Sequence, residues 1–359
     1  MKEKHYSKIK DLIPGMIVAD NIYDGNNHLI IPIGTKITDK LILRLGFYDI
    51  DNVLVWDKME VSDILPNTTY SERIKKSEDF QKFRKEFLET SEKCKESLNK
   101  IVERSASKET IDEIIASTSN LLSSQNSNLY VFDMLHNMRE MDDSTYVHSI
   151  NVALIATVLG RWLHMSEEEL KILTSSGLLH DIGKLLIPKE ILTKPKKLTE
   201  EEYTIIKTHP KKGFELLKTL DLDERILFST LAHHERCDGS GYPLKLHNAQ
   251  INDFAKIISI ADVYDAMTAA RVYRAPVCPF KVISIFETEG YSLYDPKYLL
   301  PFLSHVVDSY IHTSVLLSNG DIGEVIMINQ RYLSRPIVKC SNSYIDLSKE
   351  KKVHIESIL

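Results

Sequence analysis

The sequence has few cysteines and no excess of positive charge. Its 359 residues include only four cysteines, which are scattered without a CxxC pair (Cys94, Cys237, Cys278 and Cys340). This spacing argues against a disulfide framework, and reduced thiols in a cytoplasmic protein are the simplest account. The net charge of -6 gives no support for a basic surface that follows the phosphates of a nucleic acid. We therefore expect no nucleic-acid partner.

Long apolar runs are also missing. No stretch approaches the roughly 18 to 20 apolar residues that are needed to cross a bilayer. The N-terminus begins with mixed polar sequence and lacks the apolar core of a signal peptide. We expect no membrane span and a cytoplasmic location. The length is sufficient for two or three compact units with at least one sizeable core.

Short β-prone runs and longer helical patterns divide the chain into four regions. Residues 1–57 contain runs at 16–18, 29–31 and 53–55, and predict a small β unit with a structural or sensory role. Residues 58–128 are rich in charged helix formers and predict a helical linker. A helix-rich region is expected at 129–312 and a C-terminal β extension at 313–359, where Asn319 and Gly320 predict a hairpin turn and 336–338 and 353–355 predict further short strands. The expected fold is mainly α: an all-α helical bundle with a small N-terminal β unit, a linker helix and a C-terminal β-hairpin tail.

A seven-residue repeat marks the linker. Phe80, Phe87, Cys94 and Ile101 follow this spacing, but the intermediate positions become polar further along. The pattern favours an amphipathic helix that packs on its own chain. A helix within 69–105 that forms a homodimer or transmits a signal is the alternative.

The central region contains clear helix signals. Ser166 with Glu169, and Thr199 with Glu202, have the spacing of capping boxes that open helices. The stretch 254–270 is apolar enough for a buried helix. Metal ligands in a helical bundle project inward from facing helices, so this region is a natural place for a metal site.

Histidines are concentrated in this region, since six of the thirteen fall between His148 and His234. Two adjacent pairs, His180-Asp181 and His233-His234, lie in otherwise apolar stretches, where burial is costly unless another charge compensates. Imidazole and carboxylate without cysteine are ligands that suit manganese, iron or zinc. The cluster therefore predicts a transition-metal site.

The spacing around the first pair supports this interpretation. Adjacent residues of a helix point about 100° apart, and a carboxylate that bridges two metals next to an imidazole on one of them satisfies that geometry. Gly177 and Gly183 would allow close approach of another backbone. Lys184 lies one turn after His180 and could place its ammonium against a phosphate. A core histidine and a solvated lysine are reasonable for either residue alone, but less so when both lie beside Asp181.

Further polar residues follow the second pair. Asp238-Gly239-Ser240-Gly241-Tyr242-Pro243 is a loop that can fold over a substrate. Asp262 lies in an apolar helix and needs a compensating partner, and Asp265 follows it by three residues. Arg271 and Arg274 are suited to a phosphate or to the acceptor edge of guanine.

In this order and spacing, the motifs closely resemble those of the HD-GYP family, a branch of the HD metal-dependent phosphohydrolases. The resemblance covers roughly residues 130–310. It implies a helical bundle around a metal centre, with iron or manganese, that hydrolyses cyclic di-GMP to linear pGpG and, in some members, on to GMP.

The resemblance also implies roles for individual residues. Asp181 would bridge two metals and act in catalysis with Lys184, which would contact phosphate. The first metal would be held by His148, His180, Asp181 and Asp262, and the second by Asp181, His209, His233 and His234. The substrate would be contacted by Lys184, Tyr242, Asp265, Arg271 and Arg274.

One departure from the family pattern limits the number of metals. Members with three metals carry a glutamate four residues before the first histidine, where this chain has Ser144. We therefore expect two divalent ions rather than three. Two alternatives remain open: a receptor or adaptor with slow turnover, and a phosphodiesterase for cyclic GMP-AMP. A general HD nucleotide phosphohydrolase is disfavoured because such enzymes lack the Gly-Tyr-Pro loop.

Overall fold

The structure is a computed structural model of the whole chain, which forms two compact units, 1–69 and 70–359. The predicted linker is thus divided, because its helical part belongs to the second unit. The residues that the structure describes are 4–20, 22–23, 29–31, 37, 41–42, 45, 50, 52–56, 74–123, 130–138, 145–194, 198–269, 277–340 and 343–359. The two units are described separately.

The first unit contains short strands, as its sequence predicts. A three-stranded antiparallel sheet has the order β1 (Lys4–Lys8), β5 (Asn52–Trp56) and β2 (Ile17–Val18). The strands β3 (Ile22–Tyr23) and β4 (Leu29–Ile31) pair with each other, and η1 spans Ile9–Asp11. The strand β1 was not expected, because Lys-His-Tyr-Ser-Lys is polar. It lies at the edge of the sheet and pairs with β5 through its backbone.

The second unit begins with two long helices, α3 (Glu78–Val102) and α4 (Lys108–Ser123), which pack against each other and against the helices that follow. The repeat residues Phe80, Phe87, Cys94 and Ile101 are all buried within this unit. The favoured expectation, a helix packed on its own chain, therefore matches the structure. The apolar stripe that could have formed a dimer interface is used inside the chain.

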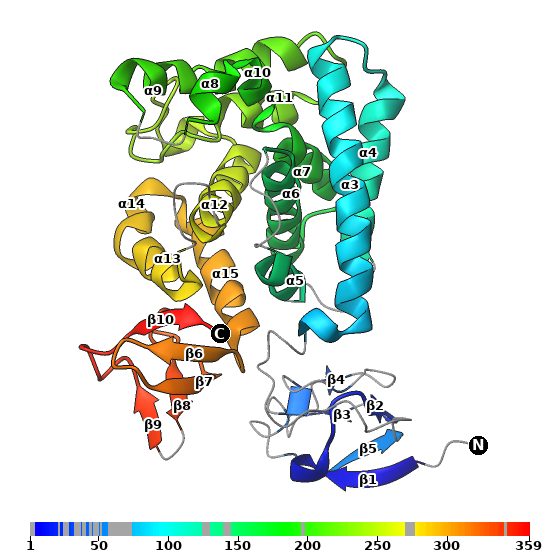
Figure 1. Cartoon of the computed structure of the whole chain (residues 1–359), viewed down its shortest axis with the longest axis vertical. Coiled ribbons are helices and arrows are strands. Elements are labelled where there is room, and N and C mark those ends of the chain that lie inside the picture. Colours follow the sequence, from blue (N-terminus) through cyan, green and yellow to red (C-terminus); the bar gives the residue numbers. More distant parts are fainter. Residues whose placement is uncertain are drawn as a thin grey trace. The chain divides into compact units, whose positions relative to one another are not determined.

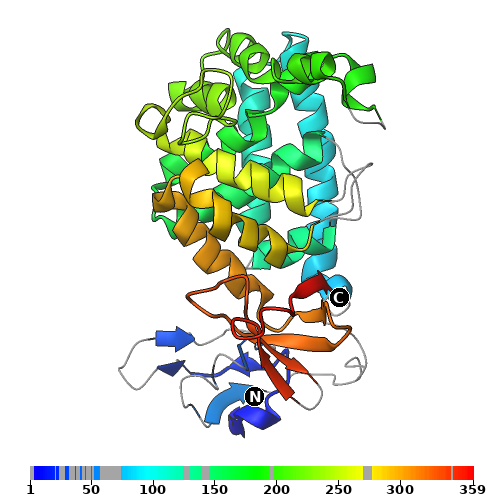
Figure 2. The same cartoon turned by 90° about the vertical axis from the view of Figure 1, so that its left-hand side faces the viewer.

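The remaining helices form a bundle (Figures 1 and 2). Two nearly apolar helices, α6 (Thr145–Trp162) and α12 (Asp253–Thr268), pack against each other, and α6 also packs extensively on α7 (Glu167–Leu179). Both predicted capping boxes are present, at α7 and at α9 (Glu200–Ile206). The other helical elements are α5 (Tyr130–Met138), η2 (Ile182–Leu186), α8 (Lys189–Leu192), α10 (His209–Leu217), α11 (Glu224–Ala232), η3 (Asn248–Gln250), α13 (Pro279–Ile285), the π-helix η4 (Phe286–Gly290), α14 (Tyr291–Leu293), α15 (Pro296–Val306) and η5 (Val307–Tyr310).

The contact between α6 and α7 depends on a glycine. A Cβ atom on Gly177 would overlap the backbone of Ala153, so only glycine allows this close approach of the two helices. Since His148 lies on α6 and His180 directly follows α7, the contact fixes the distance between these two side chains.

The C-terminal region is larger than the predicted hairpin. It is a five-stranded antiparallel sheet in the order β10 (Ile355–Ile358), β6 (Ser314–Leu317), β7 (Ile322–Met327), β8 (Ile337–Cys340) and β9 (Ser343–Asp346). The expected hairpin is its β6–β7 pair, with Gly320 at φ 89° in the turn. The mainly α fold class is confirmed. Among the described residues, no helix is both long and apolar enough to cross a membrane.

Candidate metal centre

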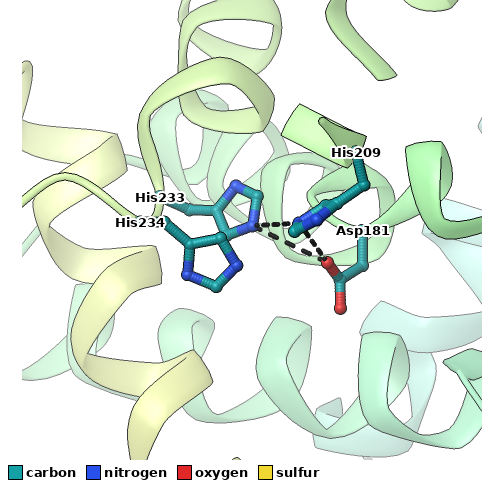
Figure 3. A group of neighbouring side chains, drawn as sticks. All are labelled: Asp181, His209, His233 and His234. Atoms are coloured by element: carbon teal, nitrogen blue, oxygen red, sulfur yellow. Dashed lines mark hydrogen bonds and ion pairs between the residues drawn. The ribbon is translucent and has the colours of Figure 1, made fainter. Parts of the chain in front are cut away.

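The structure brings together all seven predicted metal ligands, which come from distant parts of the second unit. His148 lies on α6 and Asp262 on α12, while the other five lie at or next to the ends of shorter helices. Their ligand atoms form two groups, and within each group these atoms lie within 4.8 Å of one another: Asp181, His209, His233 and His234 in one, and His148, His180 and Asp262 in the other. Figure 3 shows the first group, with the carboxylate and the three imidazoles gathered around a common point.

Asp181 lies between the two groups. Its Oδ2 atom is 3.3 Å from His180 Nε2 and 3.5 Å from His148 Nε2. Its Oδ1 atom is 3.1 Å from His209 Nε2 and 3.6 Å from His233 Nε2. Each carboxylate oxygen therefore faces a different set of imidazoles, which is the arrangement expected of a bridging ligand.

Three of the imidazoles are held in the same way. The Nδ1 atoms of His180, His209 and His233 each lie within hydrogen-bond distance of the carbonyl oxygen three residues earlier, at 2.7, 2.8 and 2.9 Å. Each of these carbonyls belongs to the last turn of a helix, where it lacks a partner within the helix. Donation by Nδ1–H to the carbonyl leaves Nε2 unprotonated and directed at Asp181. This is the tautomer that binds a metal.

A second glycine allows the approach of His209 to Asp181. Gly183 follows Asp181 by two residues, and a Cβ atom there would overlap the carbonyl of His209 and the nitrogen of Gly213. The backbone of η2 therefore contacts the start of α10 directly. The sequence-based expectation that the glycines flanking His180-Asp181 permit close backbone approach matches the structure at both positions.

His148 is held by a carboxylate instead of a carbonyl. Its Nδ1 atom is 2.8 Å from Asp265 Oδ2, while Nε2 is 3.1 Å from Asp262 Oδ1. Asn151 donates to the other oxygen of Asp265. The expectation that Asp265 contacts substrate gains no support, because its side chain is only 4% exposed and both its oxygens have partners within the helices. The sequence signal for this arrangement is the spacing on α12: residues 262 and 265 lie three apart, on one face of the helix.

The charges in the centre are those that a cation requires. Burial acts to raise the pKa of Asp181, but the charges of Lys184 and His180 hold it well below its ordinary value. Burial also acts to raise the pKa of Asp262, and the hydrogen bond with His148 outweighs it. Burial lowers the pKa of His233 to about 4, so this imidazole is neutral at pH 7. Ionised carboxylates and neutral imidazoles are the forms that bind metals.

The pKa values of two further imidazoles are shifted in opposite directions. Burial and the neighbouring His233 hold the pKa of His234 well below its ordinary value. Burial acts to lower the pKa of His148 as well, but hydrogen bonds with Asp181, Asp262 and Asp265 raise it well above its ordinary value. The carboxylates of the centre therefore attract positive charge at this point.

The donor set fits transition-metal ions. It consists of nitrogen and oxygen atoms without sulfur, which suits manganese, iron or zinc. Two atoms of the set, His180 Nε2 and Asp181 Oδ1, are buried without a hydrogen-bond partner among the described residues. Buried polar atoms are rarely left in this state, so a ligand for them is expected.

The Gly-Tyr-Pro loop lies against the centre. The ring of Tyr242 stacks on that of His234, with centroids 4.7 Å apart. Glu235 is buried and accepts hydrogen bonds from the backbone nitrogens of Leu244 and Leu246, which holds the end of the loop next to the histidine pair. The sequence analysis did not predict this role for Glu235. Its position directly after His233-His234 was the available signal.

Lys184 is a predicted phosphate contact that lies within the described part of the chain. The ammonium of Lys184 contacts Asp181 Oδ2, so it lies at the edge of the centre, as expected. Arg271, Arg274 and Ser144 lie outside the described residues.

Comparisons with known proteins agree with this fold. Residues 109–298 match the family described as HD domain. A cyclic di-GMP phosphodiesterase of Pseudomonas aeruginosa is 34% identical over 204 residues, which are 56% of this chain and 49% of the relative. A 3′3′-cGAMP-specific phosphodiesterase of Vibrio cholerae is 41% identical over 145 residues, 40% of this chain and 34% of the relative. The chain thus spans half or less of the length of these curated relatives.

One solved structure extends the comparison to the fold of most of the chain. An HDG"Y"P protein from Bdellovibrio bacteriovorus aligns with a TM-score of 0.53 at 15% identity, covering 84% of this chain and 98% of that protein. The expected HD-type fold is confirmed, and the curated relatives are phosphodiesterases of cyclic dinucleotides, as the resemblance implies. Because the matched region covers more than half of its residues, the chain belongs to the HD domain family.

Proposed function

We propose that this protein is a metal-dependent phosphodiesterase that hydrolyses cyclic di-GMP to linear pGpG. One observation carries the proposal: the two oxygens of the buried Asp181 face two separate groups of histidines. A carboxylate shared in this way is suited to a pair of metal ions that act on one phosphate. The relatives named as cyclic di-GMP phosphodiesterases supply the substrate class.

The geometry of the two groups supports the following assignment of metal ligands. One ion would be held by His148, His180, Asp181 and Asp262, and the second by Asp181, His209, His233 and His234. Iron or manganese is proposed because nitrogen and oxygen donors suit both metals and because the resemblance to the HD-GYP family implies them. We propose two ions and no third, since Ser144 offers no carboxylate at the position where the family has glutamate.

The bound ions would supply Lewis acidity, which activates water and stabilises charge on the phosphate. The protein contributes fixed positions for the ligands, since three imidazoles are held by carbonyls and a fourth by Asp265. Lys184, at the edge of the centre, would donate to a non-bridging phosphate oxygen and offset the charge that develops there. Tyr242 would line the entrance, and Arg271 and Arg274 would bind phosphate or base.

Cyclic GMP-AMP is a second candidate substrate. It is favoured by the match to a 3′3′-cGAMP-specific phosphodiesterase, which is 41% identical over the region that it shares with this chain.

A receptor with slow turnover is a third hypothesis, but the presence of all seven predicted metal ligands argues for an enzyme. A cytoplasmic location remains a prediction. A homodimer through 69–105 is the less favoured prediction, because the apolar repeat of that helix is buried within the chain; the mass of the protein in solution would test it.

The decisive experiment combines metal analysis with product identification. Protein purified without oxygen and loaded with iron or manganese should convert cyclic di-GMP to pGpG, and then to GMP if the second step occurs. Asp181→Ala should abolish both metal binding and hydrolysis, because it removes the ligand shared by the two groups. Asp253→Asn, an exposed change on α12, is the control. If Asp181→Ala kept full metal content and activity, the two-metal assignment would be wrong.

A further inference from the structure

A cation lies between two aromatic rings beside the metal centre. Lys207 Nζ is 4.4 Å from the ring centroid of Tyr203 and 5.7 Å from that of Tyr242. Tyr242 itself stacks on His234. Lys207 is therefore separated from a predicted metal ligand by a single aromatic ring.

The chemistry of this cluster differs from that of an ordinary surface lysine. Lys207 makes no ion pair with any residue that the structure describes, whereas nearby Lys194 pairs with Glu202. Tyr203 is 44% exposed, so part of a large flat ring faces solvent next to the centre. A lysine and a tyrosine four residues apart on one helix often pair without any ligand. The second ring, which comes from the distant Gly-Tyr-Pro loop, distinguishes this pair from that simple case.

A nucleotide matches the order of these groups. A nucleotide bound through its phosphate at the metal ligands carries its base one ribose away, and Tyr203 and Lys207 supply an exposed ring and a cation next to Tyr242. Aromatic rings bind bases by stacking, and lysine donates to the O6 and N7 acceptors of guanine. Adenine offers an amino group in place of O6, which disfavours an ammonium at that edge.

We propose that Tyr203 and Lys207 form a subsite for one guanine base of the substrate. The ring of Tyr203 stacks on the base, and the ammonium of Lys207 donates to its O6 and N7 edge. Lys207 thus favours guanine over adenine at this position. This inference rests on the proposed function, because it presupposes a cyclic dinucleotide with its phosphate at the metal centre.

The test compares guanine and adenine substrates in the full metal-loaded chain. Lys207→Met should raise KM for cyclic di-GMP by about 5- to 150-fold, the range for a good base-edge contact. It should leave kcat within about threefold and metal content unchanged, and it should reduce the preference for cyclic di-GMP over cyclic di-AMP by a similar factor. Lys207→Arg should retain the preference, because arginine also donates to the guanine edge.

Two further variants complete the design. Tyr203→Ala should raise KM by a similar factor, while Tyr203→Phe, which keeps the ring, should not. Lys218→Met is the control, because Lys218 lies 6.0 Å from the ring centroid of Phe214 four residues before it, and it differs from Lys207 in pairing with Glu215 and in having no second ring over it among the described residues. It should change neither KM nor the base preference.

Binding of a phosphorothioate analogue of cyclic di-GMP separates this inference from the proposed function. If the wild-type protein turned over no cyclic dinucleotide but Lys207→Met still weakened analogue binding, the subsite would stand and the catalytic proposal would fall. If turnover were normal and Lys207→Met bound the analogue as the wild type does, the subsite alone would fall. An equal loss for guanine and adenine substrates would also overturn base recognition, because a phosphate contact does not distinguish the bases.

Discussion

Asp265 offers a direct test of how the metal centre is positioned. Its Oδ2 atom is 2.8 Å from His148 Nδ1, and its Oδ1 atom accepts from Asn151 at 3.1 Å. Asp265→Asn keeps the shape of the side chain and removes its charge. The amide of Asn151 can rotate to accept from the new amide group, because its Oδ1 atom is buried without another partner. The variant should therefore fold.

The loss should appear in metal affinity. A neutral amide accepts a weaker hydrogen bond from His148 Nδ1 than a carboxylate does, so it holds the imidazole less firmly. Without the negative charge of Asp265, the imidazole is also less basic and therefore a weaker metal ligand. Changes at partners of this kind reduce metal affinity or activity by about 10- to 100-fold. That range corresponds to about 1.4 to 2.8 kcal/mol. The affinity for manganese, measured by calorimetry, should fall by this factor at one of the two sites.

The same measurement distinguishes the two roles considered for Asp265. A positioning role predicts a loss of metal affinity, with KM for the nucleotide little changed once the site is saturated with metal. A substrate contact predicts a raised KM with wild-type metal affinity, and that result would refute the positioning role. Asp253→Asn, on the same helix and paired with the exposed Lys297, controls for loss of a carboxylate and should change neither quantity.

Three further changes test other parts of the structure. Gly183→Ala should lower the free energy of unfolding by about 1 to 3 kcal/mol, the usual range for overpacking, and should also lower metal content. A wild-type melting temperature and metal content would contradict the close contact with His209. Lys184→Ala should reduce kcat by about 10² to 10³, as removal of one donor to a developing charge does, and should leave metal content unchanged. Loss of metal from this variant would refute the phosphate role of Lys184. Burial raises the pKa of the Cys94 thiol to about 12, so iodoacetamide at pH 8 should modify Cys94 only after denaturation, and mass spectrometry of the native protein would show any exception.

A metal site could be predicted from the residue pattern, whereas the individual ligands were assigned through the resemblance to the HD-GYP family. Paired ionisable residues in apolar stretches require compensation, and the pairs His180-Asp181 and His233-His234 made this visible without coordinates. The helix signals were equally local, since both capping boxes consist of residues three apart. The paired ionisable residues and the capping boxes each consist of residues that are close in the chain, so they can be recognised from the sequence alone.

Other features depend on partners far apart in the chain. The pairing of Asp265 with His148 joins residues 117 positions apart, so the sequence left open whether Asp265 faces substrate or another side chain. The polar strand β1 was missed because its place in the sheet comes from its pairing with β5. Short strands near β8 and β10 were predicted, but their assembly into one sheet was not, since β10 returns from the end of the chain to pair with β6.

The contact of Gly177 with Ala153 bears on which substitutions this chain can tolerate. Neither residue has a donor atom for a metal, yet any side chain added at Gly177 pushes α7 away from α6. That displacement would separate His180 from His148 and leave the ligands chemically intact but too far apart. In a library of all single substitutions selected for activity, position 177 should therefore be as intolerant as the ligand positions themselves.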